Sequence, residues 1–405
     1  MRFVRCRYLG AVVASGLALA CLGLFGSGCN RIDYSPSDTV SEGMSPVPDA
    51  NLVERAKQGD PEAQFQLGVV YTGSEETGRD LPQALHWYSK AAEQGYARAQ
   101  STMGQMLVAG QGVPQDVEEG RRWIELAAEQ GEVSAFFNLG QLHSLGRGFA
   151  PDPVKAVFWW RRAADQGFAD AEYNLGVAHE QGLGVEADID QALDWYRLAA
   201  ERGHLLAQHT LGVIHHNGRG VPHSAVEAVT WYRLAAEQGH APSRAQLGYM
   251  YAAGDGVAPN YSEAARWSRA AAEQGNPDGC NNMAVLYLKG FGVEQDFDRA
   301  LGWYRKAAEG NHAAAQNMLG TLYMTGNGVG RDFEQAEHWW SKAAEQDHAP
   351  AQYNLGGMYS RHLSKTLTRE VALEWLARAA AQGHAKAEAE LAALEAENSA
   401  GTSKL

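Results

Sequence analysis

Cysteine is scarce in this sequence, with four residues among 405. Cys6 and Cys21 lie in an apolar N-terminal stretch, so the rest of the chain contains only Cys29 and Cys280. Because Cys29 is expected to be processed, no pair remains from which a disulfide framework could be built. We expect Cys280 to be a small, partly buried residue; a reactive or partner-bonding thiol is the alternative.

Positive charge is also in short supply. The chain carries 34 Lys and Arg against 48 Asp and Glu, which gives a formal net charge of −14. This balance disfavours a broad basic face for nucleic acid or for an anionic membrane surface. Nucleic acid is therefore not an expected partner.

The usual motifs of nucleophilic, phosphate-binding and metal chemistry are missing. There is no nucleophile elbow, Walker loop or His-Glu-x-x-His, and the glycines from Gly326 to Gly330 follow no predicted strand. The carboxylates are scattered, as on solvated helix faces. We expect no catalytic residue and no cofactor, and hence no enzyme.

Histidines recur in register but are poorly spaced for a metal. One set is His204, His240, His312, His348 and His384, and another is His143, His179 and His215. Equivalent residues of neighbouring packed helices lie about 10 Å apart, whereas zinc–nitrogen bonds are about 2.0–2.1 Å long. We therefore predict structural histidines and no metal site.

What the chain does contain is a repeat of 36 residues. Tryptophan recurs at this interval as Trp87, Trp123, Trp159, Trp195, Trp231, Trp267, Trp303, Trp339 and Trp375. A second row is Gly68, Gly104, Gly140, Gly176, Gly212, Gly248, Ala284, Gly320 and Gly356. A fixed period of this length is typical of a solenoid.

Each repeat is predicted to form two helices, A and B, separated by a glycine-containing loop such as Gly182–Val185. Helix B is expected to begin after an N-cap row, Asp80, Asp116, Asp152, Asp188, Ser224, Asn260, Asp296, Asp332 and Thr368. It is expected to end at Gly95, Gly131, Gly167, Gly203, Gly239, Gly275, Asn311, Asp347 and Gly383. One such pair cannot bury its own apolar face, but nine stacked pairs can. We predict that the Trp row forms the core by packing against the Gly row of helix A.

The pattern Ala-x-x-x-Leu-Gly-x-x-Tyr … Gly-x-Gly-Val … Asp … Ala-x-x-Trp-x-x-x-Ala-Ala-x-Gln-Gly resembles the Sel-1-like repeat. The resemblance covers about residues 50–397. It implies an all-α, right-handed superhelical solenoid of the tetratricopeptide-like class, with helix A lining the concave wall. Members of the family are mostly adaptors and scaffolds, so the resemblance implies protein–protein interaction.

The predicted organisation follows from this register. Residues 1–29 are a lipoprotein-type signal peptide, 30–49 a flexible tether and 50–59 an N-terminal cap helix. The nine repeats span 60–95, 96–131, 132–167, 168–203, 204–239, 240–275, 276–311, 312–347 and 348–383. Residues 384–397 form a C-terminal cap helix, and 398–405 a disordered tail.

The N-terminus predicts export. Three arginines precede an apolar run, and Gly26-Ser27-Gly28 leads to Cys29. This resembles a bacterial lipobox, although leucine is preferred where Gly26 stands; Cys21 is a second candidate, and a simply cleaved or uncleaved segment is the alternative. Asn30 after the cysteine implies an outer-membrane lipoprotein facing the periplasm; a soluble periplasmic or secreted protein is the other reading.

Two rows on helix A are candidates for partner binding. One carries mainly amides and hydroxyls, including Asn138, Asn174, Asn282 and Asn354. The residue before it varies more and includes Phe137, Tyr173 and Tyr353. Amides can pair with an extended peptide backbone and aromatics supply contact area. Alternatively, the amides bond to the adjacent repeat and only fix the stacking.

We therefore predict a lipid-anchored, non-catalytic scaffold of the cell envelope that binds a protein or peptide on its helix-A face. The alternative is binding of carbohydrate or peptidoglycan, or a role with exopolysaccharide machinery, for which a lipoprotein of similar repeats is a precedent. A cell-wall or β-lactam hydrolase, as claimed for cysteine-rich relatives, is disfavoured because the paired cysteines and any nucleophile–base pair are absent.

Overall fold

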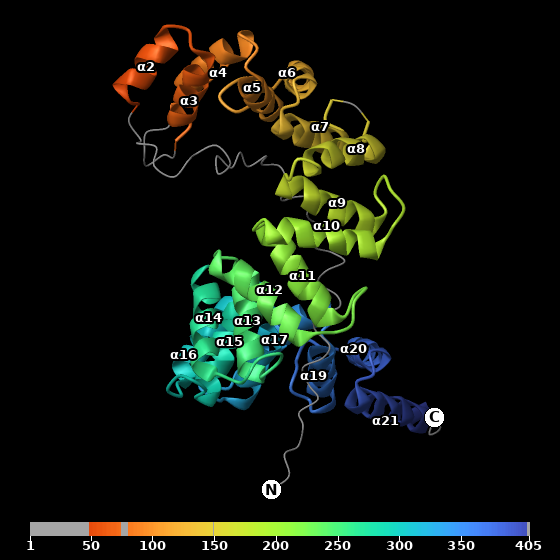
Figure 1. Cartoon of the computed structure of the whole chain (residues 1–405). Coiled ribbons are helices and arrows are strands. Elements are labelled where there is room, and N and C mark those ends of the chain that lie inside the picture. The colour runs from red at the N-terminus through yellow and green to blue at the C-terminus, as the bar shows by residue number, and fades with distance from the viewer. Residues whose placement is uncertain (1–47, 74–79, 149, 403–405) are drawn as a thin grey trace. The chain divides into compact units, whose positions relative to one another are not determined.

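The computed structural model describes residues 48–73, 80–148 and 150–402. Over these residues it contains 20 helices and no strand (Figure 1). The chain is an all-α helical solenoid, as predicted. It divides into two compact units, Met1–His204 and Leu205–Leu405.

Each unit is a stack of helix pairs. In the N-terminal unit these follow the short helix α2 (Ala50–Lys57) and are α3 (Pro61–Tyr71) with α4 (Leu81–Glu93), α5 (Ala97–Ala109) with α6 (Val117–Glu129), α7 (Val133–Leu145) with α8 (Pro153–Ala164), and α9 (Ala169–Gln181) with α10 (Ile189–Glu201). The odd-numbered members are helices A and the even-numbered ones helices B.

The C-terminal unit continues the pattern. Its pairs are α11 (Leu205–Asn217) with α12 (Ala225–Glu237), α13 (Ala241–Ala253) with α14 (Tyr261–Glu273), α15 (Pro277–Lys289) with α16 (Phe297–Glu309), α17 (Ala313–Thr325) with α18 (Phe333–Glu345), and α19 (Ala349–Ser360) with α20 (Arg369–Ala381), followed by α21 (Ala385–Thr402). Helix α21 continues to Thr402, so residues 398–402, predicted as disordered tail, are helical.

The predicted signal peptide, with Cys21 and Cys29, and nearly all of the predicted tether lie outside the described residues. Among the helices that are described, none has the length and apolar character needed to cross a membrane.

The predicted N-cap row is confirmed at all nine positions. Each side chain accepts a backbone N–H from the first turn of its helix B, for example Asp296 from Arg299 at 2.9 Å. The predicted ends are also confirmed, because every residue of that row has a positive φ, including Asn311 at 63° and Asp347 at 60°. Local capping chemistry therefore defines where helix B begins and ends.

The prediction that the Trp row packs on the Gly row is wrong by one position. The residue after each tryptophan makes that contact: a Cβ on Gly212 would lie 2.5 Å from Cδ1 of Tyr232, and one on Gly140 would overlap the ring of Trp160. Consecutive helix residues point about 100° apart, so the tryptophans lie at the edge of the core instead. Only Trp87 is fully buried, at 8% exposed, and the rest of the row is partly buried.

Cations lie over the rings of several of these partly buried tryptophans. Lys306 Nζ lies 4.4 Å from the ring centroid of Trp303, and Arg378 Cζ lies 4.7 Å from that of Trp375. In each case the cation is three residues further along the same helix, so it reaches over the ring. The Trp row thus links the core to the charged surface of helix B.

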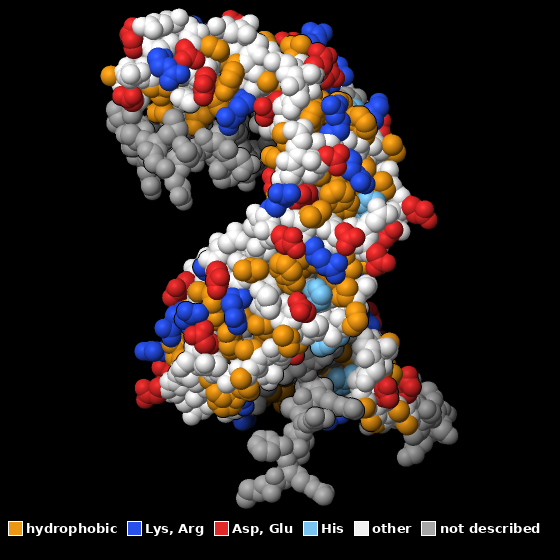
Figure 2. All heavy atoms as spheres, viewed as in Figure 1, with side chains coloured by type: hydrophobic (Ala, Val, Ile, Leu, Met, Phe, Trp, Pro, Cys, Tyr) orange, Lys and Arg blue, Asp and Glu red, His pale blue; other side chains and the backbone are white. Residues whose placement is uncertain are grey.

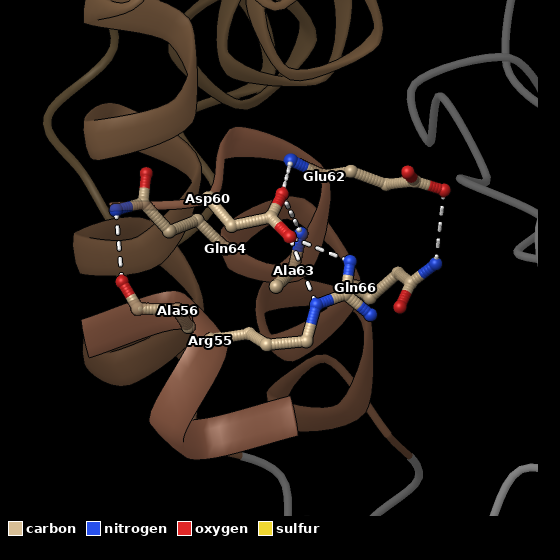
Figure 3. Close-up of polar contacts among 7 residues, drawn as sticks. All are labelled: Arg55, Ala56, Asp60, Glu62, Ala63, Gln64 and Gln66. Carbon is tan, nitrogen blue, oxygen red and sulfur yellow. Dashed lines mark hydrogen bonds and ion pairs between the residues drawn. The ribbon is translucent and has the colours of Figure 1, made fainter. Parts of the chain in front are cut away.

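Successive repeats are joined by buried glutamines, a feature we call the glutamine joint. Gln64 Nε2 donates to the Ala56 carbonyl at 3.0 Å, which ties α3 to the end of α2 (Figure 3). Gln94, at the end of the next helix B, donates to Gln64 Oε1 at 2.7 Å. The same arrangement recurs at Gln100 with Gln130, Gln316 with Gln346 and Gln352 with Gln382.

At two of the four positions where the first glutamine of the joint is replaced, another side chain reaches the equivalent carbonyl. Arg244 Nε donates to Ala236 O at 2.9 Å, and the Cys280 thiol lies 3.8 Å from Ala272 O. Cys280 is buried, at 2% exposed, and burial raises its thiol pKa. Both properties oppose thiolate reactivity and support the structural reading of this cysteine.

The corrected core register predicts a difference between two adjacent residues. Tyr232→Ala should lower the free energy of unfolding by about 3–5 kcal/mol, because it empties a fully buried site against Gly212. Trp231→Ala should cost less, about 1–3 kcal/mol, because Trp231 is only partly buried. Urea denaturation followed by circular dichroism measures both, and an equal or larger loss for Trp231→Ala would contradict this register.

The helix-end geometry predicts opposite effects for two glycines. Gly275 has a φ of 79° and space for a Cβ, so Gly275→Ala should destabilise by about 1–2 kcal/mol through backbone strain alone. Gly302 lies inside α16, also with open space, so Gly302→Ala should stabilise by about 0.5–1 kcal/mol. Thermal unfolding midpoints should move in opposite directions; shifts of the same sign would refute the strain argument.

Candidate functional site

Helices A form the more closely packed side of each stack. Within the N-terminal unit α5 approaches α7, and within the C-terminal unit α13 approaches α15 and α19 approaches α21. Among the described helices, no two helices B of successive repeats make more than marginal contact. The helix-A side is thus the inner side of each stack, where a solenoid presents its concave surface.

Several amides of the predicted binding row bond to the preceding repeat. Asn282 Nδ2 donates to the carbonyl of Ala245 at 3.0 Å, and Asn354 Nδ2 donates to Asn317 Oδ1 at 3.0 Å. These bonds cross between neighbouring helices A on the inner side. They fix how one repeat stacks on the next. This agrees with the alternative interpretation of the amide row, in which the amides bond to the adjacent repeat.

Asn138 is the amide most fully engaged in stacking. It is buried at 6% exposed; its Nδ2 donates to Ser101 Oγ at 3.1 Å and its Oδ1 accepts from Gln105 Nε2 at 2.5 Å. Ser101 also shares a hydrogen bond with Ser134 at 2.9 Å. This network closes the α5–α7 contact, so Asn138 has a structural role and little free capacity for a ligand.

Asn174 differs from the other three predicted amides. It is partly buried on α9, and within the described ranges its side chain makes no hydrogen bond. Gln246, at the same register on α13, is likewise partly buried without a hydrogen bond to a described residue, whereas Gln66 bonds to Glu62 on its own helix (Figure 3). Asn174 and Gln246 therefore keep both donors and the acceptor of an amide available.

Three aromatic residues of the variable row pack against a ring in the turn that ends their own repeat. Phe137 lies 5.1 Å from Phe168, Tyr173 lies 4.7 Å from His204 and Tyr353 lies 4.7 Å from His384, measured between ring centroids. All three aromatics are partly buried. These ring contacts hold the three side chains in place.

The histidines of the turns have structural contacts. The Nδ1 atoms of His312, His348 and His384 accept the backbone N–H three residues on, at 3.1, 3.3 and 3.2 Å, and so cap the next helix A. Burial and the nearby His312 lower the pKa of His348 to about 4. A neutral ring is needed to accept this bond, so the low pKa agrees with the capping role.

His209 belongs to the variable row, and its ring also lies in a polar cluster. Its Nδ1 and that of His240 each lie 2.9 Å from Ser243 Oγ. Burial and the adjacent His240 lower the pKa of His209 to about 4. Within the part of the chain that is described, no three His, Cys, Asp or Glu side chains come together as metal ligands.

The glutamine joint was not anticipated from the sequence, although a signal for it exists. In one repeat both positions change to a complementary pair: Arg202 replaces the second glutamine and Glu172 the first, and Arg202 Nε donates to Glu172 Oε1 at 3.0 Å. Paired substitution of this kind within one chain indicates contact between the two rows.

The profile of the Sel1 repeat matches this chain nine times in succession. The matches are residues 61–96, 97–132, 133–168, 169–204, 205–240, 241–276, 277–312, 313–348 and 349–384. The chain belongs to the Sel1 repeat family. Each match coincides with one helix pair and the turn after it, so the family's unit and the structural unit are the same.

Two solved structures resemble this Sel1 repeat protein over most of its length. A protective antigen of uropathogenic Escherichia coli that displays an SLR fold is 36% identical, with a TM-score of 0.73, covering 85% of this chain and 74% of that chain. A Sel1 repeat protein from Oxalobacter formigenes is 30% identical, with a TM-score of 0.60, covering 88% and 97%. No match was found among curated proteins.

Sel1 repeat proteins generally serve as protein-interaction scaffolds and are generally non-catalytic. The family assignment therefore directs attention to surfaces rather than to a reaction centre. In this Sel1 repeat protein, the inner amides divide into those engaged in stacking and those that remain available.

This division predicts different stabilities for two asparagine variants. Asn138→Ala should lower the free energy of unfolding by about 1–3 kcal/mol, because it leaves buried partners on α5 without their hydrogen bonds. Asn174→Ala should change it by less than about 0.5 kcal/mol, because no bond is lost. Chemical denaturation of both variants is the measurement, and a loss at Asn174 as large as at Asn138 would place Asn174 in the stacking network.

Proposed function

We propose that this Sel1 repeat protein is a non-catalytic scaffold of the bacterial cell envelope that binds a protein or peptide along its helix-A side. The supporting observation is Asn174, an inner amide that stacking leaves unengaged. Beside it in sequence, Tyr173 is held by its stack on His204 at 4.7 Å. A free amide next to an immobilised aromatic suits an extended peptide, whose backbone both donates and accepts hydrogen bonds.

The proposed location rests on the N-terminal sequence. Lipidation of Cys29 would anchor the protein, and Asn30 after it favours the outer membrane with the repeats in the periplasm. The anchor is the only membrane contact that this proposal needs. The segment before Ala50 would serve as the tether between the lipid and the first helix.

Direct glycan binding is less well supported. Sugar rings stack on exposed aromatic faces, but Phe137, Tyr173 and Tyr353 are partly buried and already contact the rings of Phe168, His204 and His384. Retention of the mature protein on insoluble peptidoglycan would nevertheless distinguish this alternative from a protein partner. A hydrolytic activity is not proposed, because the family is generally non-catalytic.

In-cell photocrosslinking tests the proposal. A photoreactive phenylalanine at Asn174, on the helix-A side, should give a discrete protein adduct after irradiation, and the adduct should fractionate with membranes. The matched control carries the same residue at Asp194, an exposed position on helix B of the same repeat. We expect no such adduct from position 194.

Two further outcomes separate the parts of the proposal. Replacing residues 1–29 with a signal peptide that is cleaved without lipidation should move the adduct from the membrane to the soluble fraction without abolishing it; retention in the membrane would exclude the proposed anchor. An adduct from position 194 and none from position 174, or capture of glycan alone, would contradict binding of a protein on the helix-A side.

A further inference from the structure

A pocket of about 310 Å³ opens on the helix-B side of the C-terminal unit. It lies along α14 and is closed at one end by the loop after α15, with Ser262, Ala265, Arg266, Arg269, Glu273 and Val293 among its lining residues. Its volume is at the lower end of the range for ligand sites, about 300–1,000 Å³. A single side chain or a small group would fill it.

The pocket exists because this repeat has small residues where the others have large ones. At the register of Ala265 the other repeats carry Leu85, Arg121, Val157, Leu193, Val229, Leu301, Glu337 and Leu373. At the register of Ala270 they carry Lys90, Leu126, Arg162, Leu198, Leu234, Lys306, Lys342 and Arg378. Only this repeat has alanine at both positions, and the missing side chains leave the space open.

Two arginines stand at this pocket, and they are held differently. Arg266 lies with its guanidinium 4.4 Å from the ring centroid of Trp267 and pairs with Glu263 at 2.9 Å. Arg269 is exposed and has no ion-pair partner among the described residues. Glu273 also lines the pocket, and with Glu263 it matches the two arginines in number, so Arg269 is the guanidinium available to a ligand.

An aromatic pair borders the same pocket. Tyr261 and Phe291 precede the lining residues Ser262 and Gly292, and their rings stack at 4.6 Å with an interplanar angle of 23°. They are 40% and 41% exposed, so part of each ring is open to solvent. Figure 2 shows basic and hydrophobic side chains next to each other over the region where Figure 1 labels α14 to α16.

We propose that this pocket is a second binding site, which takes an aspartate or glutamate side chain of a partner peptide whose neighbouring residue is aromatic. The carboxylate would be held by Arg269, with Arg266 beside it, because guanidinium forms short, directional bonds to carboxylates. The adjacent ring would pack against Tyr261 and Phe291. Such a site lies on the opposite side of the repeat from the proposed helix-A surface and does not depend on it.

The test uses the dipeptide N-acetyl-Asp-Phe-amide as the probe, with N-acetyl-Asn-Phe-amide as its neutral control. Titration into the protein is followed through the arginine Nε–Hε signals by NMR. We expect saturable shifts of the Arg269 signal with a dissociation constant of about 1 mM, as suits so small a ligand. The asparagine analogue should bind at least tenfold more weakly. Added salt should lower the affinity of the protein for the aspartyl dipeptide.

Matched variants make the test specific. Ala270→Leu introduces the residue found at the same register in α10 and α12, where it is 40% exposed, so it should fill the pocket without unfolding the protein. Arg269→Gln should abolish the shifts, whereas Arg305→Gln, one repeat further on, should leave them unchanged. Equal binding of the two dipeptides, undiminished binding by Ala270→Leu, or no saturable shift would each overturn the proposal.

Discussion

The close approach of the two helices in each repeat is the constraint on which the rest of this structure depends. Helix A provides a small residue, which is glycine in eight repeats and Ala284 in the other, and helix B fills the space with the residue that follows its tryptophan. The extreme case is the α5–α6 pair, where a Cβ on Gly104 would lie 2.5 Å from the carbonyl oxygen of Gly120, and one on Gly120 would lie 2.6 Å from that of Gly104. In several other repeats the partner is aromatic, such as Tyr196 against Gly176, whereas Gly248 faces Ser268 and Gly356 faces Leu376. Along the repeats, the small residue on helix A therefore varies less than the helix-B residue that packs against it.

Stacking of one repeat on the next uses polar groups that would otherwise be buried without partners. The glutamine joint satisfies carbonyls at the end of helix B, for example Ala92 O by Gln100 Nε2 at 3.2 Å. Buried polar groups need such partners, since an unsatisfied one costs about 1–3 kcal/mol. On the inner side, Asn138, Asn282 and Asn354 contribute to the same task. The surface available to a partner therefore consists of the inner polar groups that make no bond between repeats, among them Asn174.

Much of this architecture follows from the sequence because its determinants are local. Capping by Asp296 and the left-handed ends at Asn311 and Asp347 depend on one or two residues, and they repeat every 36 positions. The core register was harder to predict. The invariant tryptophans drew attention away from the neighbouring row, which includes Tyr232, Ser268 and Leu376 and therefore looks irregular although it is buried.

The candidate site was predictable only in part, for a different physical reason. A recurring amide on helix A can be recognised in the sequence, but its hydrogen-bond partner depends on the residue 37 positions earlier. Asn354 meets Asn317 and Asn282 meets a backbone carbonyl, whereas Asn174 meets none in the described chain. The pocket on α14 arises from Ala265 and Ala270, and neither alanine by itself indicates a pocket. It is recognised only when the same register is compared across all nine repeats.

The central claim is that a partner lies on the helix-A side, and hydrogen–deuterium exchange tests it most directly. Exchange would be compared between the mature protein alone and its complex with the partner identified at position 174. We expect slower exchange in α7 and α9 and unchanged exchange in α8 and α10. Slower exchange in α8 and α10, with α7 and α9 unaffected, would contradict an inner binding surface.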